Sequence, residues 1–187
     1  YTGTETLENF PLLVRISPER IAGFAYADCA ADGSDISFAL EDGTVLAYDV
    51  DTWNAEGESL VWVSIPNFKD GISFYFRWKD ASPQPSRATE VWSLANYKAV
   101  WHLGEASGDG LDATGNGCAA VPTGNKAETD CVRAASDSPV GPARQLATAD
   151  ATGAKSVYLK MAALDSSVFD GDFTVSFWCN KGCADKL

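Results

Sequence analysis

The feature that most constrains this chain is the run at residues 59–65 (SLVWVSI), which is apolar nearly throughout and is followed by Pro66. A strand that is covered on both faces has this pattern, and a proline ends it because proline cannot donate to the sheet ladder. The next run, residues 72–78 (ISFYFRW), instead alternates apolar and more polar residues, as a strand with one buried face does. Short strands of this kind, with turn signals between them, predict a β-sandwich.

Further strand-like runs follow the same rule along the chain. Asp42-Gly43 supplies the positive-φ positions of a hairpin turn and predicts that residues 36–40 and 44–50 are paired neighbours. No stretch carries a convincing apolar stripe with the 3.6-residue period of a helix. The chain is therefore predicted to be all-β. The remaining predicted strands are residues 10–16, 157–161 and 173–178.

The composition narrows the class of protein. Of the 187 residues 45% are hydrophobic, which suffices for a packed core, and the formal net charge is -12 at pH 7. Nucleic acids and anionic membrane surfaces select an excess of Lys and Arg, so neither is expected as a partner. No apolar run reaches the roughly 18 residues of a membrane span, so no membrane insertion is expected in this segment. The acidic balance suits an exported protein, a calcium-rich medium, or simple solubility.

Two domains are predicted, because a Pro/Ser-rich stretch at residues 81–87 (ASPQPSR) separates two groups of strands. We expect a β-sandwich domain at residues 1–80, a linker at 81–96 and a second β domain at 97–187. The chain starts with Tyr1 rather than Met, which indicates a mature, trimmed or partial chain.

The cysteine count is odd, which leaves at least one thiol unpaired or bound outside this segment. Cys118 and Cys131 flank a polar loop and could close it, and Cys179 could pair with Cys183 or elsewhere. Disulfides and free buried thiols both stay open, whereas the spacing does not fit a zinc site. The fifth cysteine is Cys29.

A family resemblance is carried by four segments of the first domain. They are residues 23–35 (GFAYADCAADGSD), 42–46 (DGTVL), 51–54 (DTWN) and 57–66 (GESLVWVSIP). With them, residues 1 to about 80 resemble a bacterial family of unassigned function that occurs in large exported proteins, often fused to proton-channel segments of the MotA/TolQ/ExbB type. The resemblance implies an extracellular, periplasmic or cell-surface location, and it implies no activity.

The second domain shows a different resemblance. Residues 101–105 (WHLGE), 112–117 (DATGNG), 157–159 (VYL) and 173–178 (FTVSFW) are similar to the start of a laminin-G-like, concanavalin A-like jelly roll. The two resemblances imply a jelly-roll-like β-sandwich followed by part of a second, concanavalin A-like β-sandwich. Because domains of the second family run well past this length, an incomplete domain is expected here.

Motifs for catalysis are missing from the sequence. The only histidine, His102, excludes a pair of histidine metal ligands, and there is no nucleophile elbow, phosphate loop or dinucleotide fingerprint. Glycosidases need two facing carboxylates, but among 26 acidic residues some pair will lie close by chance. A non-catalytic protein is therefore expected, with a hydrolase as the least favoured alternative.

Calcium is the candidate cofactor, and its candidate ligands lie in the loop at residues 109–116. Asp109, Asp112 and Asn116 offer side-chain oxygens, and a glycine-bent loop adds backbone carbonyls. The alternative is a connector whose Asp and Asn side chains bond their own backbone. Residues 27–35, with three Asp, form a weaker candidate of the same kind.

Tyr48 and Trp53 are the candidate ligand-binding residues, because they lie at or near a loop, where an aromatic ring can stack on a sugar. The other tryptophans in strands are expected in cores. The predicted function is a carbohydrate-binding or adhesion module that binds a polysaccharide or glycan. The alternative is a structural or assembly module of a cell-envelope complex, which joins other chains through strand edges.

Overall fold

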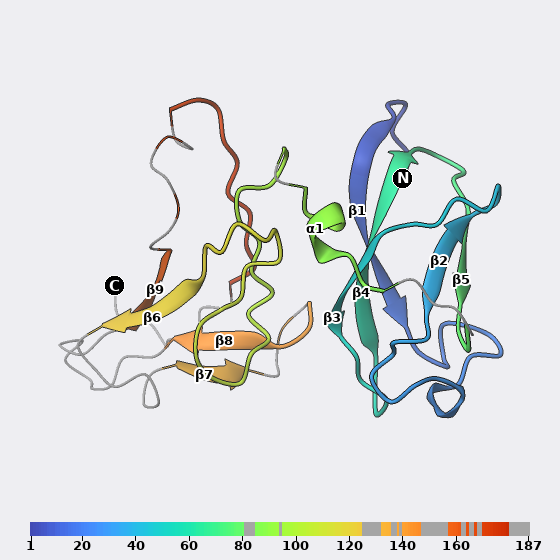
Figure 1. Cartoon of the computed structure of the whole chain (residues 1–187), viewed down its shortest axis with the longest axis horizontal. Helices are drawn as coiled ribbons and strands as arrows, with labels where there is room; N and C mark the ends of the chain where they lie inside the picture. The colour runs from blue at the N-terminus through green and yellow to red at the C-terminus, as the bar shows by residue number, and fades with distance from the viewer. Residues whose placement is uncertain are drawn as a thin grey trace. The chain divides into compact units, whose positions relative to one another are not determined.

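The computed structural model describes residues 1–80, 85–93, 95–124, 132–135, 138, 140–146, 157–161, 164, 167 and 170–179. Regular structure in these ranges is nearly all β-strand (Figure 1), with one short α-helix and one 3-10 turn. The predicted all-β class is confirmed. Within the same ranges no helix has the length and apolarity that crossing a membrane requires.

The chain divides into two compact units, each described here by itself. The first unit contains Tyr1–Val100 and also Asp112–Asn116, and the second contains Trp101–Leu111 and Gly117–Leu187. This division falls after residue 100, later than the predicted linker at 81–96. The reason is that the described part of that linker packs on the first unit.

The first sheet of the first unit has the antiparallel order β1-β4-β3. Its strands are β1 (Leu7–Ile16), β4 (Ser59–Phe68) and β3 (Tyr48–Thr52). β4 is the central strand, which explains why its sequence is apolar nearly throughout. Pro66 does not end β4, contrary to the sequence prediction. β4 continues to Phe68 because only β1 pairs with it there, while the β3 ladder extends no further than Val63.

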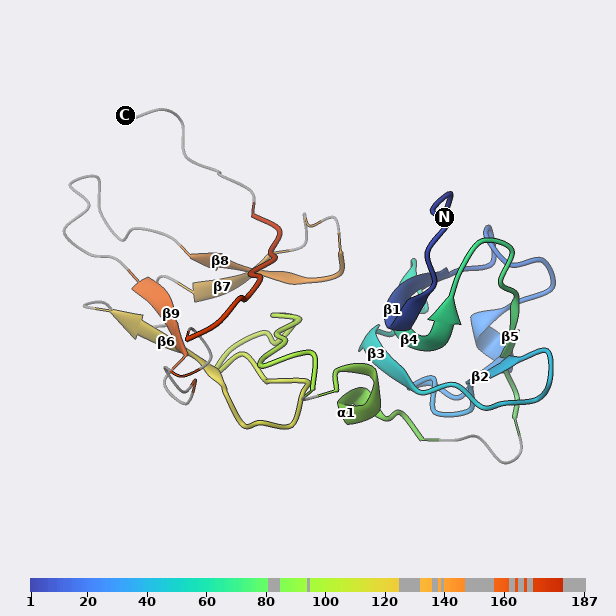
Figure 2. The same cartoon turned by 90° about the horizontal axis from the view of Figure 1, so that it is seen from above.

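The second sheet pairs β2 (Ser37–Leu40) with β5 (Phe74–Arg77), also antiparallel. Along β5 the predicted alternation is confirmed: Phe74 and Phe76 point to the core, and Tyr75 is exposed. Figure 2 shows this pair facing the β1-β4-β3 sheet, so the first unit is a two-layer sandwich.

The predicted hairpin at Asp42-Gly43 forms, but its returning strand soon leaves the sheet. Gly43 has a φ of +89°, and Val45 makes a single bridge to Ala39 of β2. The chain then crosses to the other layer, where Tyr48–Thr52 pairs with β4 as β3. Residues 44–50, predicted as one strand beside 36–40, therefore join the two sheets of the sandwich.

The core of the first unit lies between its two sheets. It contains side chains from all strands of both sheets and from the loop before β2. Each fully buried large apolar side chain stabilises the fold by about 1.5–3 kcal/mol. Its buried members are Ile16, Phe24, Ile36, Phe38, Leu46, Tyr48, Val61, Val63 and Ile65.

The outer face of the first sheet is covered by the segment that follows residue 85. Helix α1 (Ala88–Val91) places Val91 and Trp92 against the sheet, and both are buried. The ring of Trp92 meets that of Trp62 from β4 at 5.2 Å and 66°. Val91, Trp92 and Ala47 form a second buried cluster on this face, so both faces of the sheet are covered. The described part of the predicted linker therefore packs as part of the first unit.

In the described residues of the second unit, four strands form two antiparallel pairs. β6 (Ala120–Gly124) pairs with β9 (Val157–Met161), and β7 (Val132–Ala135) pairs with β8 (Ala143–Leu146). The strand predicted at residues 157–161 is confirmed. Arg144 of β8, with only 1% of its side chain exposed, donates to the carbonyls of Ser107 and Gly108 and to Glu105.

The strand predicted at residues 173–178 does not form within the described structure. This segment carries no ladder, and its apolar side chains are exposed, reaching 76% at Phe177 and Trp178. Alternation of apolar residues suits a strand, but a strand also needs a neighbour to satisfy its backbone groups.

The described cysteines lie in three settings. Cys29 is half-buried, Cys118 is buried and Cys179 is exposed, and no disulfide joins any two of them. Cys131 and Cys183 lie outside the described residues, and so do the predicted pairings of Cys118 with Cys131 and of Cys179 with Cys183.

Candidate functional site

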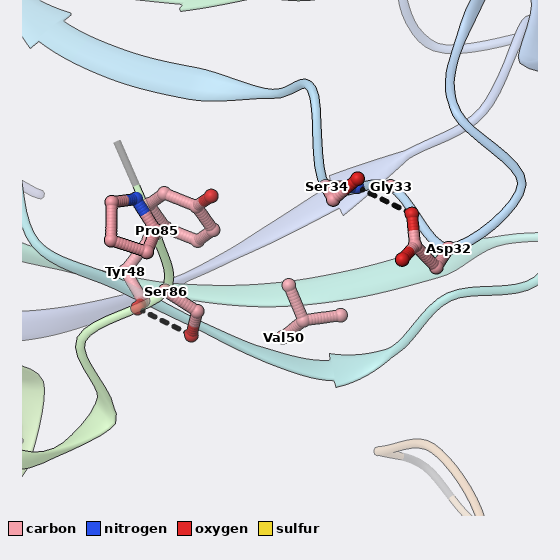
Figure 3. Close-up of a pocket in the computed structure, with 7 residues that line it drawn as sticks. All are labelled: Asp32, Gly33, Ser34, Tyr48, Val50, Pro85 and Ser86. Carbon is pink, nitrogen blue, oxygen red and sulfur yellow. Dashed lines mark hydrogen bonds between the residues drawn. The ribbon is translucent and has the colours of Figure 1, made fainter. Parts of the chain in front are cut away.

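A hollow of about 520 Å³ opens on the first unit, beside β3 (Figure 3). Its size lies within the usual range of small-molecule sites. One side comes from the loop before β2, and the other from the segment that precedes α1, with β3 between them. The hollow is lined by Asp32, Gly33, Ser34, Tyr48, Val50, Pro85 and Ser86.

The loop on one side is a hydrogen-bonded turn. The backbone N–H of Gly33 donates to the carbonyl of Ala30 at 2.9 Å, and the N–H of Ser34 donates to Asp32 Oδ1 at 3.0 Å. The N–H of Ala30 donates to Asp35 Oδ1 at 2.9 Å. Short Asp side chains that bond nearby backbone groups hold such turns. The turn therefore fixes where the exposed Asp32 carboxylate stands.

The ring of Trp53 packs against this loop at Gly33. Gly33 has a φ of +69°, and a Cβ added there would lie only 2.6 Å from Cδ2 of the Trp53 ring. The ring of Tyr26 meets the Trp53 ring edge-on at 5.3 Å and 82°. Only glycine combines that backbone conformation with such a close approach to an indole.

Tyr48 and Val50 of β3 form the apolar floor. Tyr48 is 2% exposed, and its ring packs at 5.5 Å from that of Phe38. Its hydroxyl donates to the carbonyl of Ile36 at 3.2 Å. Burial raises the pKa of Tyr48, so the phenol stays neutral at physiological pH.

The opposite side is tied to the backbone of β3. Ser86 Oγ donates to the carbonyl oxygen of Tyr48 at 3.1 Å, and the N–H of Arg87 donates to the same oxygen at 2.8 Å. Pro85 precedes these two residues and adds an apolar ring to the wall. The Ser86 hydroxyl keeps lone pairs with which it can accept a bond from a ligand.

The polar groups of the hollow are mainly acceptors. Hydrogen bonds from Ser34 lower the pKa of Asp32, so its carboxylate is ionised at neutral pH. Among the described residues that line the hollow there is no Lys, Arg or His. The site thus combines one carboxylate and two serine hydroxyls with an apolar floor, a set that suits a ligand with hydroxyl groups.

Tyr48 and Trp53, the predicted ligand-binding residues, both lie at this site, but in supporting positions. Tyr48 is buried at the base of the hollow and does not present an exposed ring face, and the Trp53 ring packs against Gly33. Sequence reasoning missed Asp32 and Ser86 as lining residues. The Asp-rich loop was a signal for the first, whereas Ser86 lies in a stretch whose composition indicated only a linker.

In the predicted calcium loop, Asp112 and Asn116 make hydrogen bonds within the protein. Asp112 Oδ1 accepts from the N–H groups of Val100 and Thr114 at 3.1 and 3.0 Å, and Asn116 Nδ2 donates to the carbonyl of Lys98 at 2.8 Å. These bonds hold Asp112–Asn116 on the first unit, whereas Asp109 belongs to the second. Across the described residues no group of three or more His, Cys, Asp and Glu is arranged to hold a metal.

Comparisons of this chain with family models, with curated proteins and with solved structures found no match.

Proposed function

We propose that this chain is a non-catalytic saccharide-binding module of an exported protein, and that the hollow beside β3 takes a neutral sugar unit. One observation carries the proposal: an ionised carboxylate and two serine hydroxyls stand over an apolar floor in a hollow of about 520 Å³. Sugars present hydroxyl donors around an apolar C–H face, and this combination matches both.

The charge of the site selects among sugars. Asp32 repels uronic acids and sulfated sugars, and the lining residues that the structure describes include no cation that could pair with them. The chain as a whole carries a net charge of -12, which acts in the same direction. Neutral hexoses and N-acetylated amino sugars are therefore the favoured class.

The test is a glycan array followed by calorimetric titration of the best neutral oligosaccharide. Asp32→Asn and Ser86→Ala are each expected to weaken binding several-fold, because each removes a polar group of the hollow. Ser73→Ala, an exposed serine away from the hollow, is the matched control and should bind as the parent does. The proposal would be refuted if neither the array nor the titration detected binding, or if all three variants lost affinity equally.

The pH and metal dependence of binding add a second test. Because the pKa of Asp32 is lowered, the carboxylate stays ionised into the acidic range, and affinity should fall only when the pH drops through that lowered pKa. Added calcium and added chelator should give equal affinity, since the described lining of the hollow holds one carboxylate, that of Asp32. Loss of binding in the chelator would instead favour a calcium-dependent site.

A second candidate function, assembly of envelope chains, is favoured by the exposed segment at residues 173–178. Val175, Phe177 and Trp178 are each more than two-thirds exposed and lie in a strand-like sequence. Such a segment can add to a strand of a second copy. Light scattering at rising concentration tests this candidate: it predicts a dimer that Phe177→Asp abolishes, and a monomer throughout rejects it.

A further inference from the structure

One dipeptide in this chain has a chemistry that the proposed function does not use. Asn116-Gly117 is the only Asn-Gly in the 187 residues. Both residues are exposed, and both lie outside helices and strands. We propose that Asn116 is a site of spontaneous deamidation, where the chain converts its own asparagine to aspartate and isoaspartate.

The backbone after Asn116 is open to the reaction. Gly117 has a φ of +71°, and nothing lies within 4 Å of the position that a Cβ would take. Since glycine has no side chain, its nitrogen can approach the neighbouring amide carbon without steric hindrance. Asn116 belongs to no helix or strand, and its backbone N–H donates to Thr114 Oγ1 at 3.3 Å.

The step needs only water. The backbone nitrogen of Gly117 attacks Cγ of Asn116, a new N–C bond forms, and the Cγ–Nδ2 bond breaks. Nδ2 leaves as ammonia, and the proton lost by the Gly117 nitrogen balances its departure. Water then adds to either carbonyl of the cyclic imide, which opens to aspartate or to isoaspartate.

Two other asparagines that the structure describes, Asn54 and Asn96, lie outside strands, and each is followed by a residue with a side chain. Asn54 is followed by Ala55, and Asn96 is followed by the bulky Tyr97. A side chain on the following residue hinders the attacking nitrogen. These two residues therefore provide an internal reference in the same sample.

The product changes the contact that Asn116 makes. In the parent chain Asn116 Nδ2 donates to the carbonyl of Lys98 at 2.8 Å. After deamidation a carboxylate faces that carbonyl, so a hydrogen bond is replaced by repulsion between two acceptors. Deamidation is expected to loosen Asp112–Asn116 from the stretch at residues 97–100.

The experiment incubates the full chain at neutral and mildly alkaline pH and maps its peptides by mass spectrometry in ¹⁸O-labelled water. Conversion at Asn116 is expected to be several-fold faster than at Asn54 or Asn96, with label in both products. Asn116→Gln, which keeps an amide but forms the ring poorly, should be inert at this position. Conversion at Asn116 that is no faster than at Asn54 would overturn the proposal.

The structural consequence has its own readout. Asn116→Asp mimics one product, and its amides at residues 97–100 are expected to exchange hydrogen several-fold faster than those of the parent chain. Amides of the β2–β5 pair serve as the control, because these strands form the other sheet of the first unit and should not change. Unchanged exchange at residues 97–100 would overturn the predicted loosening.

Discussion

The indole Nε1 of Trp92 donates a hydrogen bond to Asp49 Oδ2 at 2.8 Å, and the two residues are 5% and 8% exposed. Trp92 comes from the stretch after α1, and Asp49 from β3. The bond therefore fastens the covering segment to the outer face of the first sheet.

Trp92→Phe should destabilise the first unit. It withdraws a donor from a buried carboxylate, which costs about 1–3 kcal/mol, and it also leaves space beside Trp62. Urea unfolding followed by circular dichroism measures the loss. The control is Trp178→Phe at a position that is 76% exposed, with an expected change of less than about 0.5 kcal/mol. Equal midpoints for the two variants would contradict the role given to the Trp92 bond.

Gly33→Ala tests the contact between the loop and Trp53. An alanine at this positive φ costs about 1–2 kcal/mol, and its Cβ would also collide with the indole. Gly43→Ala is matched in backbone conformation, with a φ of +89°, but meets nothing within 4 Å. We expect Gly33→Ala to lose more stability than Gly43→Ala and to be the only one of the two that weakens saccharide binding. If the two lose equal stability, the indole does not constrain the loop.

Tyr26→Phe tests a polar junction at the end of the sandwich. The Tyr26 hydroxyl accepts from the N–H of Ser59 at 3.0 Å and lies 2.7 Å from the carbonyl of Ile16, to which it can donate. Its removal leaves the Ser59 N–H without this acceptor, which should cost about 1–3 kcal/mol in unfolding free energy. Tyr75→Phe, at a residue that is 53% exposed, should leave the urea midpoint unchanged. A midpoint for Tyr26→Phe that matches Tyr75→Phe would rule the junction out.

The stability of the first unit should fall on acidification through Glu58. Burial alone would raise the pKa of Glu58, but the hydrogen bonds and charges of Arg15 and Arg20 outweigh it and lower the pKa. A carboxyl with a lowered pKa contributes stability above its unfolded pKa and loses it as the pH falls through the folded one. Because these groups are partly exposed, the effect is modest and is screened by salt. Unfolding midpoints across the acidic range should decline less steeply for Glu58→Gln than for the parent, and parallel curves would exclude Glu58 as the source.

The strands were predictable where one local pattern decides the outcome. At residues 72–78 the alternation shows which side chains enter the core, and at 59–65 the continuous apolar run indicates a central strand. The end of β4 was not predictable from Pro66 alone. Whether a proline is tolerated depends on which neighbour pairs with the strand at that point, and that is a long-range property.

The exposure of the site residues, and which residues meet at the site, depend on long-range packing and could not be predicted from the sequence. Tyr48 and Trp53 were identified as aromatic residues near a loop, but their exposure depends on what covers them. Gly33 lies over Trp53, and the sandwich core surrounds the ring of Tyr48. Asp32 and Ser86 are distant in the sequence, and the fold brings both to one hollow beside β3.

The path of the chain determines how the first unit can be expressed alone. The chain leaves this unit at Val100, returns for Asp112–Asn116 and leaves it again. A fragment that stops at residue 100 deprives the Val100 N–H of the Asp112 carboxylate, and it uncovers the cluster to which Ala113 contributes. A fragment that runs to residue 116 retains both. A fragment that contains all of the first unit must therefore also include residues 101–111, which belong to the second unit. No single truncation point separates the two units without removing residues from one of them.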